Sequence, residues 1–310
     1  MVNLDNYFSS FDFAQRKGIL KTMNHIPVAK EYSGTYFVTL NDESYFIKVA
    51  SEKNIFYKMY AELVAERLAP LVNLDSIKSD IALINYGTDK IKDYRYALIS
   101  KDYRKDGYDV YSNQEMNIYY MDELEKKGLY DKYYGDNSIN QDSLDVIWDS
   151  YYYHYKDFKN RDAIVENKVK EQVRRFIFRF YIMDRDFHLG NGETLDCENL
   201  SLTEDSPMFD MDQAFNPLYY YRNNSMRGAG LDDPYDDFDS FLDISDDSVY
   251  SYASSMHNIL TPEVLENTIK SMEHSDNIKV PNEYKNEMVS LYSKHYDKID
   301  DILKKRIKVK

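Results

Sequence analysis

The sequence predicts an α+β chain with two lobes, a small antiparallel β-rich N-lobe followed by a larger and mostly helical C-lobe. Between residues 31 and 100, segments rich in β-branched and aromatic residues alternate with polar turns and surround a single helical segment. After residue 165, apolar residues recur at helical spacing over long stretches. A chain of 310 residues is long enough to give two such lobes a sizeable core.

The N-lobe is expected to cover residues 1–104, and its elements follow from local patterns. YFVTL and SYFIKVA predict a hairpin around a short polar turn. Residues 55–71 carry apolar side chains on one face of a helix, whose end is marked by Pro70. DIALINYG and YRYALIS indicate two further strands, so one helix is expected to pack on an antiparallel sheet.

The C-lobe is expected to cover residues 105–310, after the pattern breaks at SKDYRKDG. Residues 101–165 are polar, rich in tyrosine and weakly periodic, and they predict no definite element. One long helix is predicted from residue 166 to 183, directly before DRDFHLGNG, and another from 284 to 308. The aspartate-rich segment 231–248 lacks the D-x-D-x-D-G register of a calcium loop, so a solvated loop is expected there.

Composition restricts the possible partners and compartments. The net charge of -15 and the lack of a basic patch argue against direct binding of nucleic acid or of an anionic membrane. A single cysteine permits no intrachain disulfide and suits a reducing compartment. No signal-peptide pattern and no long apolar stretch are evident, so a cytoplasmic location is expected. Export by a signal-independent route would leave no mark in the sequence.

The segment YIMDRDFHLGN places Asp186 and Asn191 five residues apart, directly after an apolar helix. Phosphoryl transfer requires a carboxylate that orients or deprotonates the attacking hydroxyl, together with oxygen ligands for Mg²⁺. A kinase catalytic loop has its aspartate and its metal-binding asparagine at this separation. Taken alone, the pattern also fits a solvated loop with a side-chain cap.

Asp210 in SPMFDMDQAF is expected at the end of a short apolar strand, the place of a second Mg²⁺ ligand between nucleotide phosphates. Asp212 would share its face if the strand continued, and is the weaker candidate. The stretch between Asn191 and Asp210 has room for a hairpin that would bring the two loops together. An aspartate in an ordinary turn is the alternative.

Lys48 lies in the predicted strand SYFIKVA, on the same side as Phe46. A lysine in this place suits the α- and β-phosphates of a nucleotide, with a carboxylate on the following helix as its partner. Glu62 and Glu66 are one turn apart on that helix and are the two candidates. The alternative is a lysine that protects an edge strand from aggregation.

The order of these parts favours a kinase, because a strand lysine, a helix glutamate, a catalytic loop and a later aspartate follow one another as in a protein-kinase-like fold. The segment EYSGTYF is a poorer match to a phosphate-covering loop, since it has one glycine. Ser33, Gly34 and Thr35 can still offer backbone N–H groups and hydroxyls to phosphate. A plain β-turn is the alternative.

These residues resemble the HipA-like kinases, bacterial serine/threonine kinases that are often toxins of toxin–antitoxin pairs. DRDFHLGN resembles the family's N-x-D-R-H-x-x-N loop, and SPMFDMDQAF resembles its a-P-x-x-D-N-G segment. AELVAERLAPLVNL is similar to the family's N-E-x6-L-A helix, which favours Glu62 over Glu66. SKDYRKDG resembles the hinge-side segment of small HipA-like proteins, so the resemblance covers about residues 30–215.

The resemblance implies a two-lobed protein-kinase-like fold and phosphate transfer from Mg-ATP to a protein serine or threonine. It makes Asp186 the catalytic aspartate, and Asn191 and Asp210 the Mg²⁺ ligands. The residues on the nucleotide side are Lys48, Glu62, Ser33, Gly34, Thr35 and His188, the last of which is expected to support the loop itself. An antitoxin-type partner protein is also implied, as is self-phosphorylation at Ser33 or Thr35, which inactivates some relatives.

The sequence departs from the family at a few places. Asp184 stands where the family often has asparagine, and no glycine follows Asp210 in D-M-D. The chain is expected to lack the extra N-terminal subdomain of full-length HipA toxins. A kinase of a small-molecule hydroxyl and an ATP-binding pseudokinase are the alternative functions. A metal-dependent hydrolase is disfavoured, because the six histidines are scattered without the spacing of a zinc site.

Overall fold

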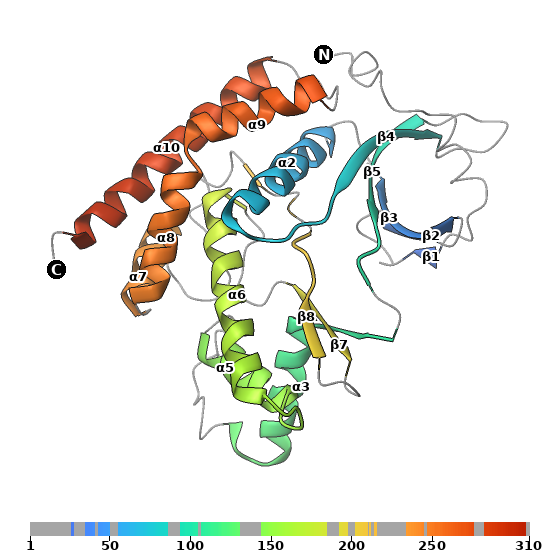
Figure 1. The fold of residues 1–310 in the computed structure, drawn as a ribbon, viewed down its shortest axis with the longest axis vertical. Helices are drawn as coiled ribbons and strands as arrows, with labels where there is room; N and C mark the ends of the chain where they lie inside the picture. The colour runs from blue at the N-terminus through green and yellow to red at the C-terminus, as the bar shows by residue number, and fades with distance from the viewer. Residues whose placement is uncertain are drawn as a thin grey trace.

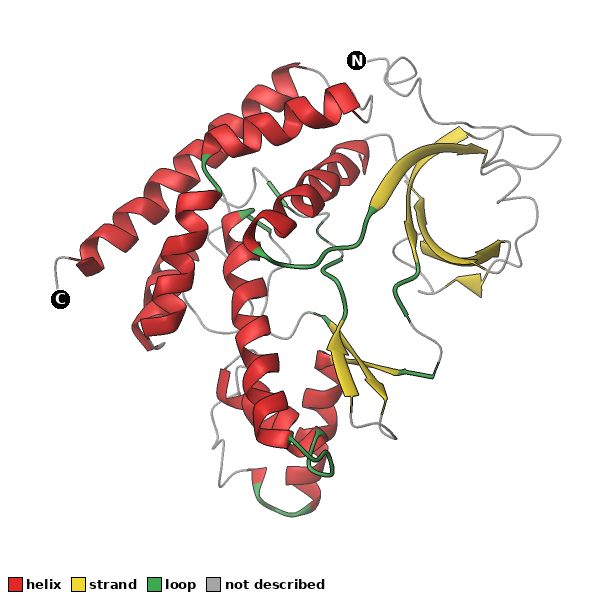
Figure 2. Cartoon of the chain, viewed as in Figure 1, coloured by secondary structure: helices red, strands yellow, loops and turns green. Residues whose placement is uncertain are grey.

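The computed structural model shows a curved β-sheet beside a larger body of helices, which also carries a second, smaller sheet (Figures 1 and 2). The residues that it describes are 26–27, 35–40, 43–49, 55–85, 94–104, 107–130, 144–184, 192–197, 202–209, 211, 214–215, 234–244, 247–275 and 282–307. This arrangement confirms the two-lobed α+β architecture that the sequence predicts. Among the described helices, none has the length and apolar character needed to cross a membrane.

The curved sheet has five antiparallel strands in the order β1-β2-β3-β5-β4. Its strands are β1 (Ile26–Pro27), β2 (Thr35–Leu40), β3 (Glu43–Val49), β4 (Ser79–Asn85) and β5 (Tyr94–Lys101). The predicted hairpin is confirmed as β2 and β3, and the two further strands are confirmed as β4 and β5. Sequence patterns missed β1, because two paired residues leave no periodicity to detect.

Lys48 lies on β3, the third of the five strands. It pairs in register with Thr35 of β2 on one side and with Leu98 of β5 on the other. The alternative of a lysine that protects an edge strand is therefore wrong. Ile47 is buried, and successive side chains of a strand point to opposite faces, so Lys48 extends from the other face of the sheet.

The predicted helix after β3 is confirmed as α2 (Ile55–Leu68), which continues into the 3-10 turn η2 (Ala69–Val72). Pro70 lies in the first turn of η2, where a residue without a backbone N–H is tolerated. The predicted apolar face is buried, but so are Glu62 and Glu66. Both faces are covered because α2 lies between the curved sheet and α9 (Pro262–Ser275) (Figure 1).

The smaller sheet contains β6 (Asp109–Ser112), β7 (Glu193–Cys197) and β8 (Leu202–Asp205), antiparallel and in that order. β7 and β8 form the hairpin that the sequence predicts before Asp210. β6, α3 (Asn113–Lys126) and α5 (Leu144–His154) occupy a region for which no element was predicted. α3 nevertheless begins with a capping box between Ser112 and Glu115, a signal that is present in the sequence.

The helical body is arranged around α6 (Arg161–Tyr181), which confirms the predicted long helix (Figure 1). Around it lie α7 (Pro234–Ile244), α8 (Asp247–Ile259), α9 and α10 (Asn282–Ile307), the last of which is the second predicted helix. Buried apolar residues of α2, α6 and α7 to α10 form one continuous core. α2 is therefore part of the same core as the helical body.

The expectation of a solvated loop at residues 231–248 is wrong, because its described residues, 234–244 and 247–248, belong to α7 and to the start of α8. Tyr235, Phe238 and Leu242 are buried at helical spacing and anchor α7 in the core. Asp239 lies between them in the sequence and forms an ion pair of 2.6 Å with Arg306 of α10. The high density of aspartates concealed an amphipathic pattern.

Candidate active site

Lys48 and Glu62 join the curved sheet to α2 through an ion pair. The ammonium nitrogen of Lys48 lies 3.5 Å from Oε2 of Glu62, which is the glutamate that the resemblance indicates. The Lys48 side chain is 22% exposed and that of Glu62 is 4% exposed. A buried carboxylate requires compensation of its charge, and the ammonium group is the member of the pair that a ligand can approach.

Glu66, one turn further along α2, fixes the helix to the start of β4. Its carboxyl oxygens accept the backbone N–H of Ser79 at 2.9 Å and the Ser79 hydroxyl at 2.6 Å. Its backbone carbonyl accepts the hydroxyl of Ser76 at 2.8 Å. Burial, together with the charge of Glu62, raises the pKa of Glu66 to about 8. The raised pKa favours the protonated form of the Glu66 carboxyl in the fold, and its hydrogen bonds secure the helix turn next to Glu62.

Most of the other predicted site residues lie outside the described residues: Ser33, Gly34, Asp186, His188, Asn191 and Asp210. The backbone of Thr35 is described and starts β2 directly opposite Lys48. The structure thus brings together Lys48, Glu62 and the backbone of Thr35, while the roles of all these residues in binding and catalysis stay predictions. The residues on either side of the predicted loops show where the chain enters and leaves them.

The chain enters the segment of Asp186 from a fixed turn at the end of α6. Met183 has a left-handed backbone with a φ of 53°. The N–H of Asp184 donates to the carbonyl of Arg179 at 2.9 Å, and that of Met183 donates to Phe180 at 3.0 Å, which is a Schellman ending. Glycine usually occupies the left-handed position, and a methionine there costs about 1 kcal/mol. The buried side chain of Met183 holds the turn in place.

The chain leaves this segment at Gly192, the residue directly after Asn191. Gly192 has a φ of +133°, a conformation that L side chains rarely adopt, and a Cβ there would lie 3.1 Å from Nη1 of Arg175. Its carbonyl accepts the N–H of Asn113, at the start of α3, at 3.1 Å. Packing and hydrogen bonding thus hold the backbone one residue beyond Asn191.

Asp210 does not follow a strand, so this detail of the prediction is wrong. β8 ends at Asp205, and beyond it Met208 forms a single parallel bridge with Ser76. The N–H of Met208 donates to Asp75 at 2.8 Å, and its carbonyl accepts from Ile77 at 3.0 Å. Ser76 lies between the end of η2 at Val72 and the start of β4 at Ser79, and the pairing there is an isolated bridge. The segment 206–209 is still tied to residues that follow α2.

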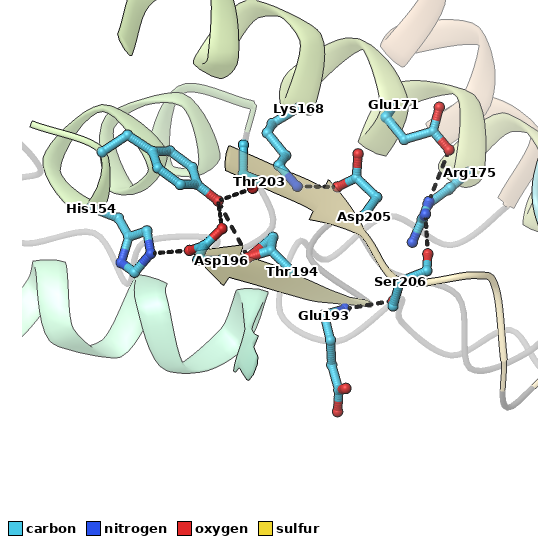
Figure 3. A network of polar contacts seen from close by, with 11 residues as sticks. His154, Lys168, Glu171, Arg175, Glu193, Thr194, Asp196, Thr203, Asp205 and Ser206 are labelled. Carbon is cyan, nitrogen blue, oxygen red and sulfur yellow. Dashed lines mark hydrogen bonds and ion pairs between the residues drawn. The ribbon is translucent and has the colours of Figure 1, made fainter. Parts of the chain in front are cut away.

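A stripe of cationic side chains on α6 lies alongside the segment 205–209. Lys168 lies 2.9 Å from the carboxylate of Asp205, and Arg175 donates to the carbonyl of Ser206 (Figure 3). Arg179, one turn further, donates to the carbonyl of Phe209 at 2.7 Å. Burial lowers the pKa of Lys168, and the charge of Asp205 opposes that effect. The approach to Asp210 is therefore held along its length by α6.

The hairpin of β7 and β8 is fixed to α5 by a second set of polar contacts. Asp196 is fully buried, and its carboxylate lies 2.8 Å from Nε2 of His154 (Figure 3). The Tyr155 hydroxyl lies 3.3 Å from Asp196 and 3.2 Å from the hydroxyl of Thr203. Because these contacts join a helix to both strands, they give the hairpin a fixed position beside the predicted loops.

Sequence reasoning missed an aromatic stack next to the change of lobe. The ring of Tyr103 lies 6.2 Å from that of Phe46 on β3 and 5.8 Å from that of Phe209. Its hydroxyl donates to Glu193 of β7, and burial raises the pKa of this phenol. Tyr103 belongs to the SKDYRKDG segment that the family resemblance includes, which is the one signal that pointed to it. It joins the curved sheet to the segment before Asp210.

Comparison with solved structures identifies the fold. The Helicobacter pylori proinflammatory kinase CtkA matches with a TM-score of 0.60 and 15% identity, over 92% of this chain and 95% of that chain. The chain has a HipA-like kinase fold. HipA of Shewanella oneidensis, solved with HipB and operator DNA of its toxin–antitoxin system, matches with a TM-score of 0.52 and 10% identity, over 95% of this chain and 73% of that chain. No family model and no curated protein sequence matches the chain.

The HipA-like kinase fold confirms the resemblance drawn from the motifs. At sequence identities of 10% and 15%, the two structural matches show the fold alone and leave the chemistry to the residues of this chain. Within the described residues, the observation closest to that chemistry is the pair of Lys48 with Glu62.

Proposed function

We propose that this chain is an ATP-dependent protein serine/threonine kinase that uses Mg²⁺. The observation that carries the proposal is the ion pair between Lys48 on a central strand and Glu62 on α2, in a fold shared with kinases. In protein kinases this pair holds the lysine against the nucleotide phosphates. The family motifs at 184–191 and 206–215 support the same function.

The described residues fit a nucleotide phosphate. Lys48 is partly exposed beside a buried carboxylate, and the start of β2, directly after Ser33 and Gly34, lies opposite it. Asn191 and Asp210 would supply the oxygen ligands that Mg²⁺ prefers. When bound, Mg²⁺ neutralises the charge that develops on the phosphates during transfer.

The surroundings of Asp184 support Asp186 as the residue that accepts the proton of the attacking hydroxyl. Asp184 is fully buried, and its carboxylate forms an ion pair of 2.5 Å with Arg179. A carboxylate in that position is held by its partner and cannot reach a substrate hydroxyl. Asp186, two residues further along, is the next carboxylate and lies five residues before Asn191.

A protein acceptor and a protein partner complete the proposal. The net charge of -15 favours the approach of basic protein segments, which supports a protein acceptor over a small anionic metabolite. The Shewanella HipA structure contains HipB of a toxin–antitoxin system, which supports an antitoxin-type partner for this chain as well. Self-phosphorylation at Ser33 or Thr35 belongs to the same proposal.

The test incubates the purified chain with Mg²⁺ and γ-labelled ATP, and measures ATP turnover together with label on the chain and on lysate proteins. Lys48→Met, Asp186→Asn and Asp210→Asn should each lower turnover by at least about a hundredfold. Lys58→Met, at an exposed position of α2, is the matched control and should retain wild-type turnover. ATP binding without turnover in the wild-type chain would indicate a pseudokinase. Label on metabolites alone would indicate a small-molecule kinase.

A further inference from the structure

Arg175 and Arg179 are one turn apart on α6, and both are buried. Buried guanidinium groups are rare unless their donors meet acceptors. Here each arginine contacts two segments that are distant from each other in the sequence. One segment adjoins the predicted loop 185–191, and the other is the run 206–209 that leads to Asp210.

Arg179 connects the entrance of the loop to the residue before Asp210. Its Nη1 donates to the carboxylate of Asp184 at 2.5 Å, and its Nη2 donates to the carbonyl of Phe209 at 2.7 Å. Asp184 is two residues before Asp186, and Phe209 is one residue before Asp210. A single planar guanidinium group therefore sets the spacing between these two backbone segments.

Arg175 bonds to the segment 206–209 and packs closely against the exit of the loop. Its Nη2 donates to the carbonyl of Ser206, while its Nε donates to Glu171 on the same helix at 3.1 Å (Figure 3). Its Nη1 lies so close to Gly192 that a Cβ there would be 3.1 Å away. The chain thus passes Arg175 directly after Asn191.

Only arginine combines these contacts. The guanidinium group presents five N–H donors in a rigid planar fork, so it can donate in two directions at once. A lysine in the same place carries the same charge but gathers its donors on one nitrogen at the end of a flexible stem. Lysine therefore keeps the charge at these positions while losing at least one of the hydrogen bonds that each arginine makes.

We propose that Arg175 and Arg179 are positioning residues that fix the spacing between the described segments next to the predicted Mg²⁺ ligands, which are Asp184 and Gly192 on one side and residues 206–209 on the other. This inference rests on the proposed function, because it concerns the same metal site. The two arginines act through the backbone: they hold the segments on either side of the ligands and leave coordination to the ligands. Loss of either connection should weaken Mg²⁺ binding more than it weakens nucleotide binding without metal.

The test compares wild-type chain with Arg179→Lys and Arg175→Lys. The Mg²⁺ concentration that gives half-maximal ATP turnover should rise about tenfold in each variant, the usual effect of removing a support behind a metal ligand. Binding of ADP in the presence of EDTA should change by less than about twofold, since the Lys48 side of the site is untouched. Arg174→Lys is the matched control, because Arg174 lies between the two on the exposed face of α6.

A second variant keeps the test valid if a lysine variant is unstable. In the double variant Arg179→Met/Asp184→Asn both members of the buried ion pair lose their charge, which removes the cost of an unpaired charge while the donor to Phe209 stays absent. Its thermal unfolding should recover relative to Arg179→Met, but its Mg²⁺ requirement should stay raised. Recovery of both together would mean a purely structural role and would overturn the inference.

The outcomes separate this inference from the proposed function. Wild-type turnover with an unchanged Mg²⁺ requirement in folded Arg175 and Arg179 variants overturns the inference and leaves the proposed function intact. A wild-type chain without Mg²⁺-dependent turnover overturns the proposed function, and the inference falls with it.

Discussion

Replacing Glu66 by glutamine tests whether this buried carboxyl is protonated in the folded chain. Both oxygens of Glu66 accept hydrogen bonds from Ser79, and the charge of Glu62 lies one turn away. Glutamine has the shape of the protonated acid and cannot ionise. The amide oxygen of glutamine can accept the backbone N–H of Ser79 while its NH2 group donates to the Ser79 hydroxyl, so the substitution keeps the packing of α2, reverses one hydrogen bond and removes the ionisation.

The magnitude follows from the difference between the two states. The pKa rises from an ordinary 4.5 to about 8 on folding. A raised pKa in the folded state gives stability that is fully present below pH 4.5 and is lost as the pH rises through 8. At about 1.4 kcal/mol for each pKa unit, the whole difference amounts to at most about 5 kcal/mol. We expect Glu66→Gln to gain at least about 2 kcal/mol over the wild-type chain between pH 5.5 and pH 8.5.

The measurement is the free energy of unfolding of both chains by urea titration across this pH range. Glu287→Gln, at an exposed position of α10, is the control and should follow the wild-type chain at every pH. The reasoning is refuted if the difference between Glu66→Gln and wild type stays constant with pH. A difference that grows in the opposite direction would mean that Glu66 is ionised and stabilised in the fold.

Two further substitutions test other parts of the structure by the same unfolding measurement. Burial lowers the pKa of His295 from 6.5 to about 3, and its ring nitrogens contact Tyr235 and Phe180 at 2.8 Å. A lowered pKa in the folded state gives stability that is lost as the pH falls below 6.5. The wild-type chain should therefore lose up to about 1.4 kcal/mol of unfolding free energy per pH unit in acid, and His295→Gln should lose less. An unchanged dependence on pH in the variant would contradict this. Gly192→Ala should cost about 1–3 kcal/mol and more than Gly128→Ala, because both glycines have positive φ but nothing lies within 4 Å of a Cβ at Gly128. Equal losses of stability at the two glycines would show that the Arg175 side chain moves aside without an energetic cost.

Much of the fold follows from short-range patterns in the sequence. The hairpin of β2 and β3, the strands β4 and β5, and the helices α2, α6 and α10 have clear periods of two or 3.6, and all were predicted. The hairpin of β7 and β8 was predicted from the distance between two motifs rather than from a period. The division of the chain at residue 104 stays a prediction.

The missed helices α5 and α7 share a physical cause, which is that polar residues obscure the apolar face. In α7 the aspartates are as numerous as the buried apolar residues, and in α5 the buried positions include a tyrosine. A tyrosine counts as half polar in a sequence pattern, yet Tyr151 and Tyr155 are completely buried. With 31 tyrosines in the chain, hydropathy underestimates how much of it belongs to the core.

The candidate site also contains residues that the sequence predicts and residues that it does not. Lys48 could be predicted from the alternating pattern of the strand SYFIKVA, and Glu62 from the resemblance of its helix to the family motif. Arg175 and Arg179 could not be predicted, because in sequence they are basic residues of an amphipathic helix that would ordinarily face solvent. Their burial depends on carbonyl groups of Ser206 and Phe209, some thirty residues away, and such long-range acceptors leave no local signal.

The contacts of α2 explain why the pair of Lys48 and Glu62 is informative about the whole site. At its C-terminal end α2 is bound to the helical body, since the carbonyl of Val72 accepts the hydroxyl of Tyr252 on α8 at 3.2 Å. Ser76 binds the carbonyl of Glu66 and also bridges to Met208, two residues before Asp210. The place of Glu62 is thus set by the same body that carries the predicted loops, while Lys48 arrives with the curved sheet. An intact pair therefore requires that the curved sheet keeps its place relative to α2 and to the helical body.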